Sequence, residues 1–546
     1  MPLSSDPRFY YLHNFHKVLA WIGERHADLL DEREHGFVRA FGTLEVPSQA
    51  LLVRMIMRKG VHFRASKLGY EEIGCCRQAV LALLDQGWIV DDAALTLDEL
   101  LALLRKDEIV AHFADRLSDR RARKDDLLLQ LQPHCSETQS FANWCANLDD
   151  RLYSLTIDDL CERLRLMFFG NLRQDWSEFV LSDLGIFRYE QVELSRDARA
   201  WRCRGDIDDY LHLQRCREAF EAGEPIAEVL ERIGEQPHAT PYIAERRAKL
   251  LFRIGQYLER SGEFDLALHV YAGSGYSAAR QRRIRVLERA GLYRQAYELA
   301  RETLAAPCSD GEVQLAERAL VRLTRQLGLP RAGKRSTPSA SRLDLQLSRA
   351  TALGVEHAVQ QHLQQADAPV HYVENTLICS LFGLLCWPAI FAPLPGAFFH
   401  PFQFGPADLL AADFHGRRAP LFAECLARLD DGTYPQRIRQ TYQDKFGIQS
   451  PFVHWGVLSE TLLEQALDCL PPAHLKAWFL RLLGNIQANR AGMPDLIQFW
   501  PGEKRYRMIE VKGPGDRLQD NQRRWLAFCA EHGMQVDVCY VQWADA

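Results

Sequence analysis

The sequence predicts a multidomain protein whose first two-thirds are mostly α-helical and whose last third is an α/β domain. A chain of 546 residues is too long for one hydrophobic core. Over the first 330 residues, apolar residues recur three and four positions apart in long stretches, which is the helical period. Near the C-terminus, two short runs of aliphatic and aromatic residues flank a Pro-Gly turn signal, which is typical of a β-hairpin.

The composition excludes several protein classes. Apolar residues make up 47% of the chain and charged residues 25%, as in globular proteins. No run of about 18 uncharged apolar residues exists, and the N-terminus lacks the layout of a signal peptide. The 14 cysteines form no CxxC motif, so neither a zinc ribbon nor a disulfide framework is indicated. We therefore expect a protein of the reducing cytoplasm with no membrane partner.

Residues 1–67 are predicted to form an N-terminal helical domain. Its last part mixes basic residues with aromatic ones, a combination suited to gripping a nucleic-acid backbone. A helix end whose cations lie along apolar surface explains the same pattern, so both interpretations stay open. The candidate DNA-binding residues in this part are Arg54, Arg58, Lys59, Arg64 and Lys67.

Residues 68–240 are predicted to form a second helical domain. Short amphipathic helices alternate here with an extended stretch, and Thr96 followed by Glu99 is a capping box that opens a helix. The helix–extended–helix layout of residues 70–114 resembles a SAP domain, a small DNA-binding module. The resemblance implies a DNA-binding function for this domain.

Residues 241–330 contain two similar units, each with a helix, a glycine-containing turn and a second helix. Gly262 and Gly291 mark the two turns, at a spacing close to the tetratricopeptide period. The region from Arg246 to Arg342 holds 19 Lys/Arg and 9 Asp/Glu, a local charge of +10 in a chain of net charge −6. Either a DNA-contacting surface or a solvated helix face explains this segregation. The candidate DNA-binding residues here are Arg282, Arg283 and Arg285.

Residues 331–342 are polar, basic and rich in proline and serine, so they are predicted to be a linker. The overlapping stretch Gly328–Arg335 nearly spells a phosphate-binding loop. However, Arg335 replaces the hydroxyl that binds Mg²⁺, and a helical pattern precedes the loop where a strand is needed. Nucleotide binding is therefore not expected there.

The C-terminal hairpin carries the residues that point to chemistry. Asp495 starts its first strand, and Glu510 and Lys512 share one face of its second strand, while Val511 faces a core. The hairpin brings Asp495 beside Glu510, because both lie at a similar distance from the turn. Two such carboxylates repel each other, and a hard cation such as Mg²⁺ or Mn²⁺ removes the conflict. A surface salt bridge between Glu510 and Lys512 is the plain alternative.

Residues 492–526 carry the pattern of a nuclease family. Pro-Asp followed by Glu-x-Lys is the PD-(D/E)xK signature, and a glycine-containing loop and a helix with Gln522 and Trp525 come next. The stretch therefore resembles a virus-type replication-repair nuclease (VRR-NUC) domain. The resemblance implies that residues 343–546 form this α/β nuclease domain, with an insertion near 387–470.

A PD-(D/E)xK core usually adds an acidic residue from a preceding helix. Glu374 fits, because it would share a helix face with Leu377 and Leu381. A carboxylate on such an apolar stripe needs a partner or a metal ion. Glu356 and Glu424 compete for the same role.

Similarity to one family extends over nearly the whole chain. The stretches 10–22, 50–64 and 446–455 are similar to those of bacterial Fanconi-associated nucleases. The resemblance implies a structure-selective DNase that cuts 5′ flaps, degrades DNA 5′→3′ and serves in interstrand-crosslink repair at the nucleoid. It carries the metal ligands onto Glu374, Asp495, Glu510 and the carbonyl of Val511, and the catalytic lysine onto Lys512.

Other functions stay open at this point. A junction-resolving or restriction-type endonuclease would share the core, but a bulky chain with its own DNA-binding modules favours a monomer. A helical-repeat scaffold with a vestigial nuclease is disfavoured by the intact carboxylates and lysine. No Cys/His pattern matches the ubiquitin-binding zinc finger of human-type relatives. A further cluster is expected to be structural rather than metal-binding: His400, Asp408, Asp413 and His415.

Overall fold

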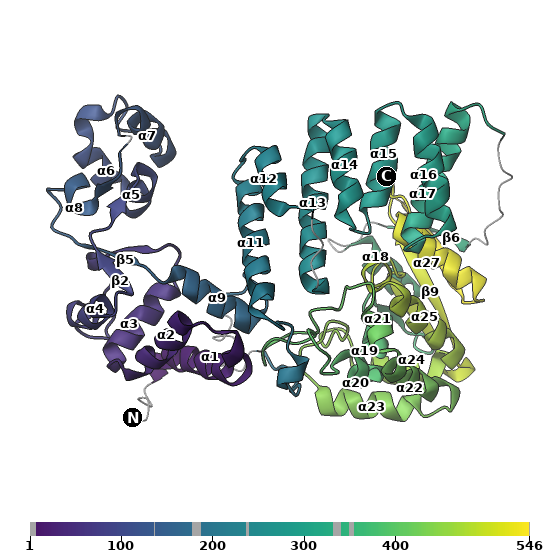
Figure 1. Ribbon diagram of the computed structural model, residues 1–546. Coiled ribbons are helices and arrows are strands. Elements are labelled where there is room, and N and C mark those ends of the chain that lie inside the picture. The colour runs from purple at the N-terminus through teal and green to yellow at the C-terminus, as the bar shows by residue number, and fades with distance from the viewer. Residues whose placement is uncertain are drawn as a thin grey trace. The chain divides into compact units, whose positions relative to one another are not determined.

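Helices dominate the first 330 residues of the computed structural model, and a mixed sheet lies in the last third (Figure 1). The structure describes residues 7–135, 137–176, 187–235, 240–330, 340–348 and 354–544. Internal contacts divide the chain into Met1–Ile186 with Trp201–Ile207, and Phe187–Ala200 with Asp208–Ala546. None of the described helices is long and apolar enough to cross a membrane. The predicted fold class is confirmed.

A five-stranded sheet organises the C-terminal part of the second unit. Its order is β6-β10-β9-β8-β7, with β10 parallel to both β6 and β9, and β8 antiparallel to both β9 and β7. The hairpin predicted from the sequence is β8 with β9, in a register that pairs Leu496 with Ile509. The strands are β6 (Ser341–Leu347), β7 (Val370–Tyr372), β8 (Leu496–Trp500), β9 (Arg505–Lys512) and β10 (Val536–Trp543).

Helices cover both faces of this sheet. Leu496, Ile509 and Val511 pack on one face in a core with Val359 of α18, which confirms that Val511 faces a core. Met508 and its neighbours pack on the other face in a larger core. The helices are α18 (Val355–Leu363), α19 (Leu377–Leu385), α20 (Trp387–Ile390), α21 (Phe414–Arg417), α22 (Ala419–Asp430), α23 (Tyr434–Lys445), α24 (Glu460–Cys469), α25 (Pro472–Gly484), α26 (Ile486–Asn489) and α27 (Asp520–Glu531).

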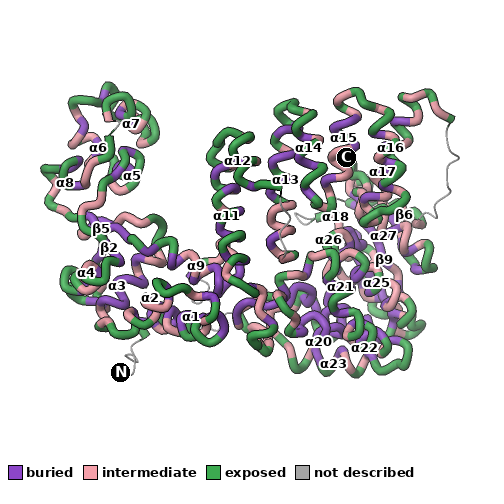
Figure 2. The backbone as a smooth tube through the Cα atoms, viewed as in Figure 1, coloured by how far each residue is buried: buried purple, intermediate pink, exposed green. Residues whose placement is uncertain are grey.

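The larger core includes the segment 387–470, which the sequence predicts to be an insertion. Phe422 of α22 and Leu463 of α24 are buried in the same cluster as Phe382 of α19 and Phe479 of α25. Figure 2 shows this concentration of buried residues around α20, α22 and α25. The segment therefore packs into the same core as the rest of the C-terminal α/β domain.

The helical repeats precede the sheet. Consecutive helices pack against each other, and Gly262 and Gly291 take positive φ angles of 84° and 76° between the two helices of each hairpin. Glycine adopts this conformation without steric cost, so both turns form where the sequence predicts them. The helices are α13 (Pro241–Ser261), α14 (Phe264–Ser274), α15 (Ala279–Arg289), α16 (Tyr293–Ala305) and α17 (Asp310–Gln326).

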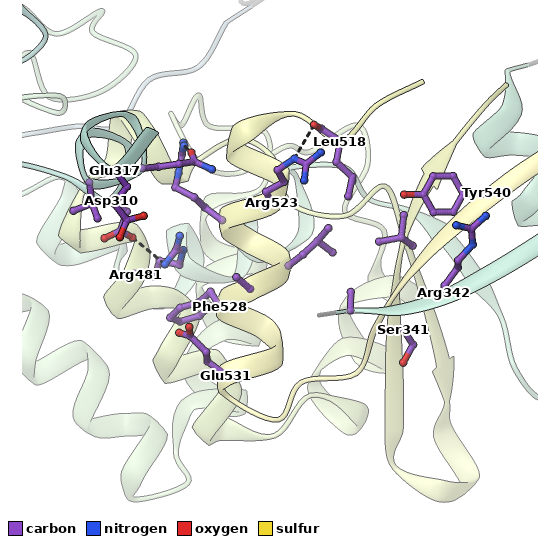
Figure 3. A pocket seen from close by; sticks show the side chains of 17 residues that line it. Asp310, Glu317, Ser341, Arg342, Arg481, Leu518, Arg523, Phe528, Glu531 and Tyr540 are labelled. Atoms are coloured by element: carbon purple, nitrogen blue, oxygen red, sulfur yellow. Dashed lines mark hydrogen bonds and ion pairs between the residues drawn. The ribbon is translucent and has the colours of Figure 1, made fainter. Parts of the chain in front are cut away.

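The last repeat helix contacts the C-terminal α/β domain through charged side chains. Arg318 of α17 donates two hydrogen bonds to Asp520 of α27, at 2.5 and 2.6 Å. Arg481 of α25 lies 3.1 Å from Asp310. A cavity of about 800 Å³, lined by α17, α25, α27 and the β6 edge, opens beside these pairs (Figure 3).

The predicted linker lies mostly outside the described residues, since the structure describes residues 340–342 of it and not 331–339. The near-match to a phosphate-binding loop falls largely on the same segment. Ser341 and Arg342 already belong to β6, because their backbones pair with Asp537 and Val538 of β10. The strand thus begins earlier than the composition of the linker suggests.

The first unit has two helical groups. One surrounds a three-stranded antiparallel sheet of order β1-β5-β2, and the other has its own core. The first group contains α1 (Tyr10–His26), α2 (Glu32–Thr43), α3 (Val46–Ile56), β1 (His62–Arg64), α4 (Cys76–Asp85), β2 (Ile89–Asp91), β5 (Leu152–Leu155) and α9 (Asp158–Phe169). The second contains α5 (Leu97–Leu103), α6 (Lys106–His112), α7 (Lys124–Leu131) and α8 (Phe141–Trp144). Thr96 and Glu99 form the predicted capping box at the start of α5.

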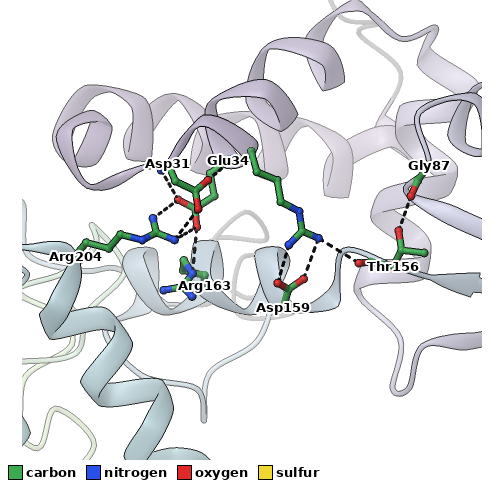
Figure 4. A network of polar contacts seen from close by, with 8 residues as sticks. Asp31, Glu34, Gly87, Thr156, Asp159, Arg163 and Arg204 are labelled. Atoms are coloured by element: carbon green, nitrogen blue, oxygen red, sulfur yellow. Dashed lines mark hydrogen bonds and ion pairs between the residues drawn. The ribbon is translucent and has the colours of Figure 1, made fainter.

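A buried carboxylate ties together three segments of the first unit (Figure 4). Glu34, in the first turn of α2, is 2% exposed and forms a capping box with Asp31. Arg204 donates to Glu34 at 2.7 Å, and Arg163 of α9 lies 3.1 Å from the same carboxylate. Because a carboxylate removed from water needs cationic partners, Arg204 holds residues 201–207 against α2, and Arg163 holds α9 against it.

Candidate active site

The hairpin holds Asp495 in place from two sides. The amide N–H of Val511 donates to the Asp495 carboxylate at 2.8 Å, and the N–H of Val373 donates to the Asp495 carbonyl at 2.8 Å. The pairing of Leu496 with Ile509 places Asp495 opposite Glu510, as the sequence predicts. Asp495 therefore has a fixed orientation at the start of β8.

Glu510 and Lys512 lie together on β9, away from solvent. Glu510 is 0% exposed and Lys512 is 8% exposed, and Nζ of Lys512 lies 2.6 Å from Oε1 of Glu510. This burial excludes the surface salt bridge considered from the sequence. Among the described residues, Oε2 of Glu510 has no hydrogen-bond donor. A buried carboxylate oxygen without a donor is costly, and a bound cation would satisfy it.

The raised pKa values of Asp495 and Glu510 also favour a cation site. Burial raises the pKa of Asp495 to about 6, and the neighbouring Glu374 and Glu356 add to the rise. Burial raises the pKa of Glu510 to about 7, and the charge of Asp495 contributes. Lys512 opposes both shifts. Two carboxylates that resist ionisation side by side suit a site for a divalent cation.

Glu374 lies in a turn and not on a helix, which corrects the expectation from the sequence. The turn follows β7, and α19 begins only at Leu377, because Asn375 takes a left-handed φ of 55° that breaks the helical run. Its carboxylate accepts hydrogen bonds from the hydroxyl of Tyr372 at 2.5 Å and from the amide of Asn375 at 3.1 Å. Glu374 still lies near enough to raise the pKa of Asp495 and Glu510.

The hairpin brings Asp495, Glu510 and Lys512 together, and Glu374 comes from the separate turn after β7. Within the described ranges, no group of three or more His, Cys, Asp or Glu side chains converges as a ready metal site. Of the two competing residues, Glu356 in the first turn of α18 adds to the raised pKa of Asp495, and Glu424 is exposed on α22. Glu356 lies at the start of a helix beside the sheet, and the sequence alone does not show that this position is near Asp495.

The helix α27, which follows β9, begins with a capping box. Gln522 accepts a hydrogen bond from the N–H of Gln519 at 2.8 Å and forms a capping box with it, while Trp525 is buried. Gly492 takes a φ of 94°, and a β-carbon there would lie 2.7 Å from Asn521 of the same helix. Gln522 thus fixes α27, and glycine at 492 lets the loop before Asp495 approach it.

Two residues of the cluster of His400, Asp408, Asp413 and His415 are described by their surroundings. Asp408 binds Arg418, whose side chain is 0% exposed, at 2.8 Å. His400 is buried, and burial lowers its pKa to about 3.

The basic residues of the first unit differ in their accessibility. Arg58, Lys59 and Lys67 are exposed. Arg54 pairs with Glu72 at 2.5 Å and lies over the Tyr11 ring. Arg64 is 5% exposed and bound to two carboxylates, Glu108 at 2.7 Å and Asp150 at 2.8 Å, so its guanidinium cannot reach a phosphate as the sequence suggests. The physical reason is that Arg64, the last residue of β1, is buried against these two carboxylates.

The arginines of α15 surround one buried carboxylate. Glu259 is 1% exposed, and Arg282 lies 2.6 Å from it. Arg283 is half-buried. Arg285 keeps 60% of its side chain exposed, although it also lies 3.5 Å from Glu259. Of the three candidates, Arg285 is therefore the most accessible to a phosphate.

The cavity between α17 and α27 is separate from the carboxylates, because neither Asp495, Glu510 nor Lys512 lines it. Its arginines already have partners. Arg481 pairs with Asp310, and Arg523 donates to the carbonyl of Leu518 at 3.2 Å (Figure 3).

Three family models match the chain. The FAN1 HTH domain model matches residues 9–90, the Fanconi anemia-associated nuclease SAP domain model 94–144, and the VRR-NUC domain model 430–543. The sequence pattern that resembles a SAP domain covers residues 70–114, and the SAP model matches only from residue 94 on. The first half of that stretch falls largely within the match of the HTH model.

Relatives that match nearly all of this chain are named as Fanconi-associated nucleases. A Fanconi-associated nuclease 1 homolog from Pseudomonas aeruginosa is 57% identical over 99% of this chain and 97% of its own length. A homolog from rice is 24% identical over 97% of this chain and 62% of its own length.

Solved structures also match over the whole chain. A crystal structure of paFAN1 bound to 2nt 5′flap DNA with gap has a TM-score of 0.94 at 56% identity, and the match covers 99% of both chains. A second, of paFAN1 bound to 1nt 5′flap DNA with gap, has a TM-score of 0.92 at 57% identity and covers 98% of this chain and 99% of that one.

Proposed function

Because this chain belongs to the Fanconi-associated nuclease family, we propose that it cuts 5′ flaps, degrades DNA 5′→3′ and serves in interstrand-crosslink repair. The chain is a structure-selective, divalent-metal-dependent DNA nuclease with a VRR-NUC domain. The buried pair of Asp495 and Glu510 with Lys512 beside it supports the cleavage chemistry, and the match to structures of paFAN1 bound to 5′flap DNA supports the flap substrate. In a bacterial cell, the enzyme would act as a monomer on the DNA of the nucleoid.

The residues of the hairpin fit a hard cation. Asp495, Glu510 and the carbonyl of Val511 would hold Mg²⁺ or Mn²⁺, with Glu374 as a further ligand, because all four groups offer oxygen. When bound, such an ion lowers the pKa of a coordinated water and polarises the phosphodiester. Lys512 would place its ammonium group beside this water and offset the charge that develops on the phosphate. Val511 N–H keeps Asp495 aimed at the site.

The metal requirement gives the direct test of this proposal. The full chain, incubated with labelled 5′-flap DNA, should cut with Mg²⁺ or Mn²⁺. Ca²⁺ should bind without supporting cleavage, because its looser coordination misplaces the attacking water. Product length measured on strands labelled at either end reports the position and polarity of cutting. Cleavage without any divalent ion, or equal cleavage of flap and plain duplex, would refute the proposal.

The pKa of Glu510 predicts how the stability of the metal-free chain depends on pH. Folding raises this pKa to about 7, so the native state binds the proton more tightly than the unfolded state does. The resulting stabilisation is present below about pH 4.5 and is lost as pH rises through 7. Relative to Glu510→Gln, the wild-type chain should lose on the order of 2 kcal/mol of unfolding free energy across this window. Denaturant titrations of both proteins at several pH values measure the difference.

Mn²⁺ should restore the lost stability in the wild type and not in Glu510→Gln, because the ion replaces the proton. A difference between the two proteins that stays constant from pH 4.5 to 7.5 would show that Glu510 does not titrate in this window.

Salt dependence tests where the DNA backbone lies. We propose that Arg58, Lys59 and Lys67 contact phosphates, with Arg285 as a contact on the repeats, because these side chains are exposed. Reversing the first three to Glu should weaken flap binding and reduce the slope of log affinity against log salt by about 0.9 per lost contact. Arg285→Glu should reduce it by about one contact. The slopes are obtained from DNA affinities measured by fluorescence anisotropy at salt concentrations from about 50 to 300 mM. Unchanged slopes in both variants would place the DNA elsewhere.

A further inference from the structure

We infer that Asn375 is a positioning residue that fixes the Glu374 carboxylate relative to Asp495 and so sets the geometry of the metal site. The inference rests on the proposed role of Glu374 as a metal ligand. Asn375 is proposed to contact neither the metal nor the DNA and to act only through Glu374.

The side chain of Asn375 uses both of its polar atoms. Its Nδ2 donates to Oε1 of Glu374 at 3.1 Å, and its Oδ1 accepts from the backbone N–H of Met493 at 3.0 Å. Met493 lies two residues before Asp495 in the loop that enters β8. One amide thus joins the segment that carries Glu374 to the segment that carries Asp495.

A second contact makes this connection rigid. The N–H of Val373 donates to the carbonyl of Asp495 at 2.8 Å, so the segments 373–375 and 493–495 are joined at both ends. If the Asn375 bridge is removed, the backbone pairing of β7 with β8 remains, but the turn that carries Glu374 loses its contact with the loop.

The identity of the residue matters for two reasons. Its φ of 55° lies in the left-handed region, which asparagine tolerates better than most residues. An amide also supplies one donor and one acceptor, and this bridge needs both. Tyr372 binds the other oxygen of Glu374, but it lies on the strand next to Glu374 and gives no contact with Met493. The bridge is therefore specific to Asn375.

The variant Asn375→Gly distinguishes the role of the Asn375 side chain from that of its backbone conformation. Glycine keeps the left-handed turn without strain but removes both hydrogen bonds. Titration of the full, DNA-free chain with Mn²⁺ in a calorimeter should show about tenfold weaker binding, as for other residues that orient a metal ligand. Lys504→Gly is the matched control, because Lys504 is exposed and also has a left-handed φ, of 50°, in the hairpin turn. Its Mn²⁺ affinity should equal that of the wild type.

A double variant shows whether Asn375 acts through Glu374. Glu374→Ala should itself weaken Mn²⁺ binding, and adding Asn375→Gly should cause no further loss. Additive losses would mean that Asn375 supports the site by another route, and wild-type affinity in Asn375→Gly beside weak binding in Glu374→Ala would overturn the inference. Wild-type affinity in Glu374→Ala would instead refute Glu374 as a ligand. Thermal midpoints of all variants, measured without metal, confirm that each is folded.

Discussion

Asp495→Ala is expected to lower the rate of flap cleavage by about three orders of magnitude or more, which corresponds to about 4 kcal/mol of activation free energy. The carboxylate is buried at the start of β8 and held by the N–H of Val511, so its removal takes a fixed ligand from the proposed metal site. DNA affinity should stay within about twofold, because phosphate contacts from basic residues provide most of it. Single-turnover cleavage and anisotropy binding, both on 5′-flap DNA, measure the two quantities.

Glu503→Ala is a suitable control for this variant. Glu503 is also an acidic residue of the hairpin, but it is exposed in the turn after β8 and pairs with Arg505 at 2.5 Å. Its removal should leave the cleavage rate unchanged. If Asp495→Ala lost DNA binding to the same extent as cleavage, the assignment of metal binding to the hairpin and of DNA binding to other, basic residues would be wrong.

Lys512→Ala is expected to remove most of the activity, by roughly two to three orders of magnitude, as removal of a group that stabilises transition-state charge does. Binding of Mn²⁺ at pH 8 should persist, because the lysine is no ligand. The variant should also show a shift in pH dependence. The pKa of Glu510 rises further without the ammonium group 2.6 Å away, so Mn²⁺ binding should require a higher pH than in the wild type.

Calorimetric Mn²⁺ titrations at two pH values, together with cleavage rates, test both statements. Lys504→Ala removes an exposed lysine from the same hairpin and should change neither quantity. Full activity in Lys512→Ala would reduce the lysine to a buried ion-pair partner of Glu510.

The hairpin could be predicted from the sequence because its signals are local. Two short runs of aliphatic and aromatic residues, the Pro-Gly turn between them and similar distances from the turn were enough to place Asp495 beside Glu510, and the strand register agrees. The turn at Glu374 could not be predicted in this way. Its apolar neighbours have the helical spacing, and only the left-handed backbone of Asn375 delays the helix to Leu377.

The role of the basic residues depends on partners far along the chain. Arg64 lies among exposed cations in the sequence, yet its partners Glu108 and Asp150 are 44 and 86 residues away. Arg282 likewise meets Glu259 of a neighbouring helix. Composition identifies a basic segment, but the tertiary fold decides which of its charges face solvent and which neutralise a buried carboxylate.

The buried Glu34 has a practical consequence for anyone who wishes to study the N-terminal unit in isolation. A fragment that stops at residue 186 would include Arg163 but lack Arg204, and Glu34 would keep only one of its two arginine contacts. Loss of a partner from a buried ion cluster typically costs about 3–5 kcal/mol, a large share of the stability of a small domain. Expression of a shortened version should therefore extend at least through Glu221, because Arg204 is the first residue of the helix Arg204–Glu221 and a single turn of it would not be stable.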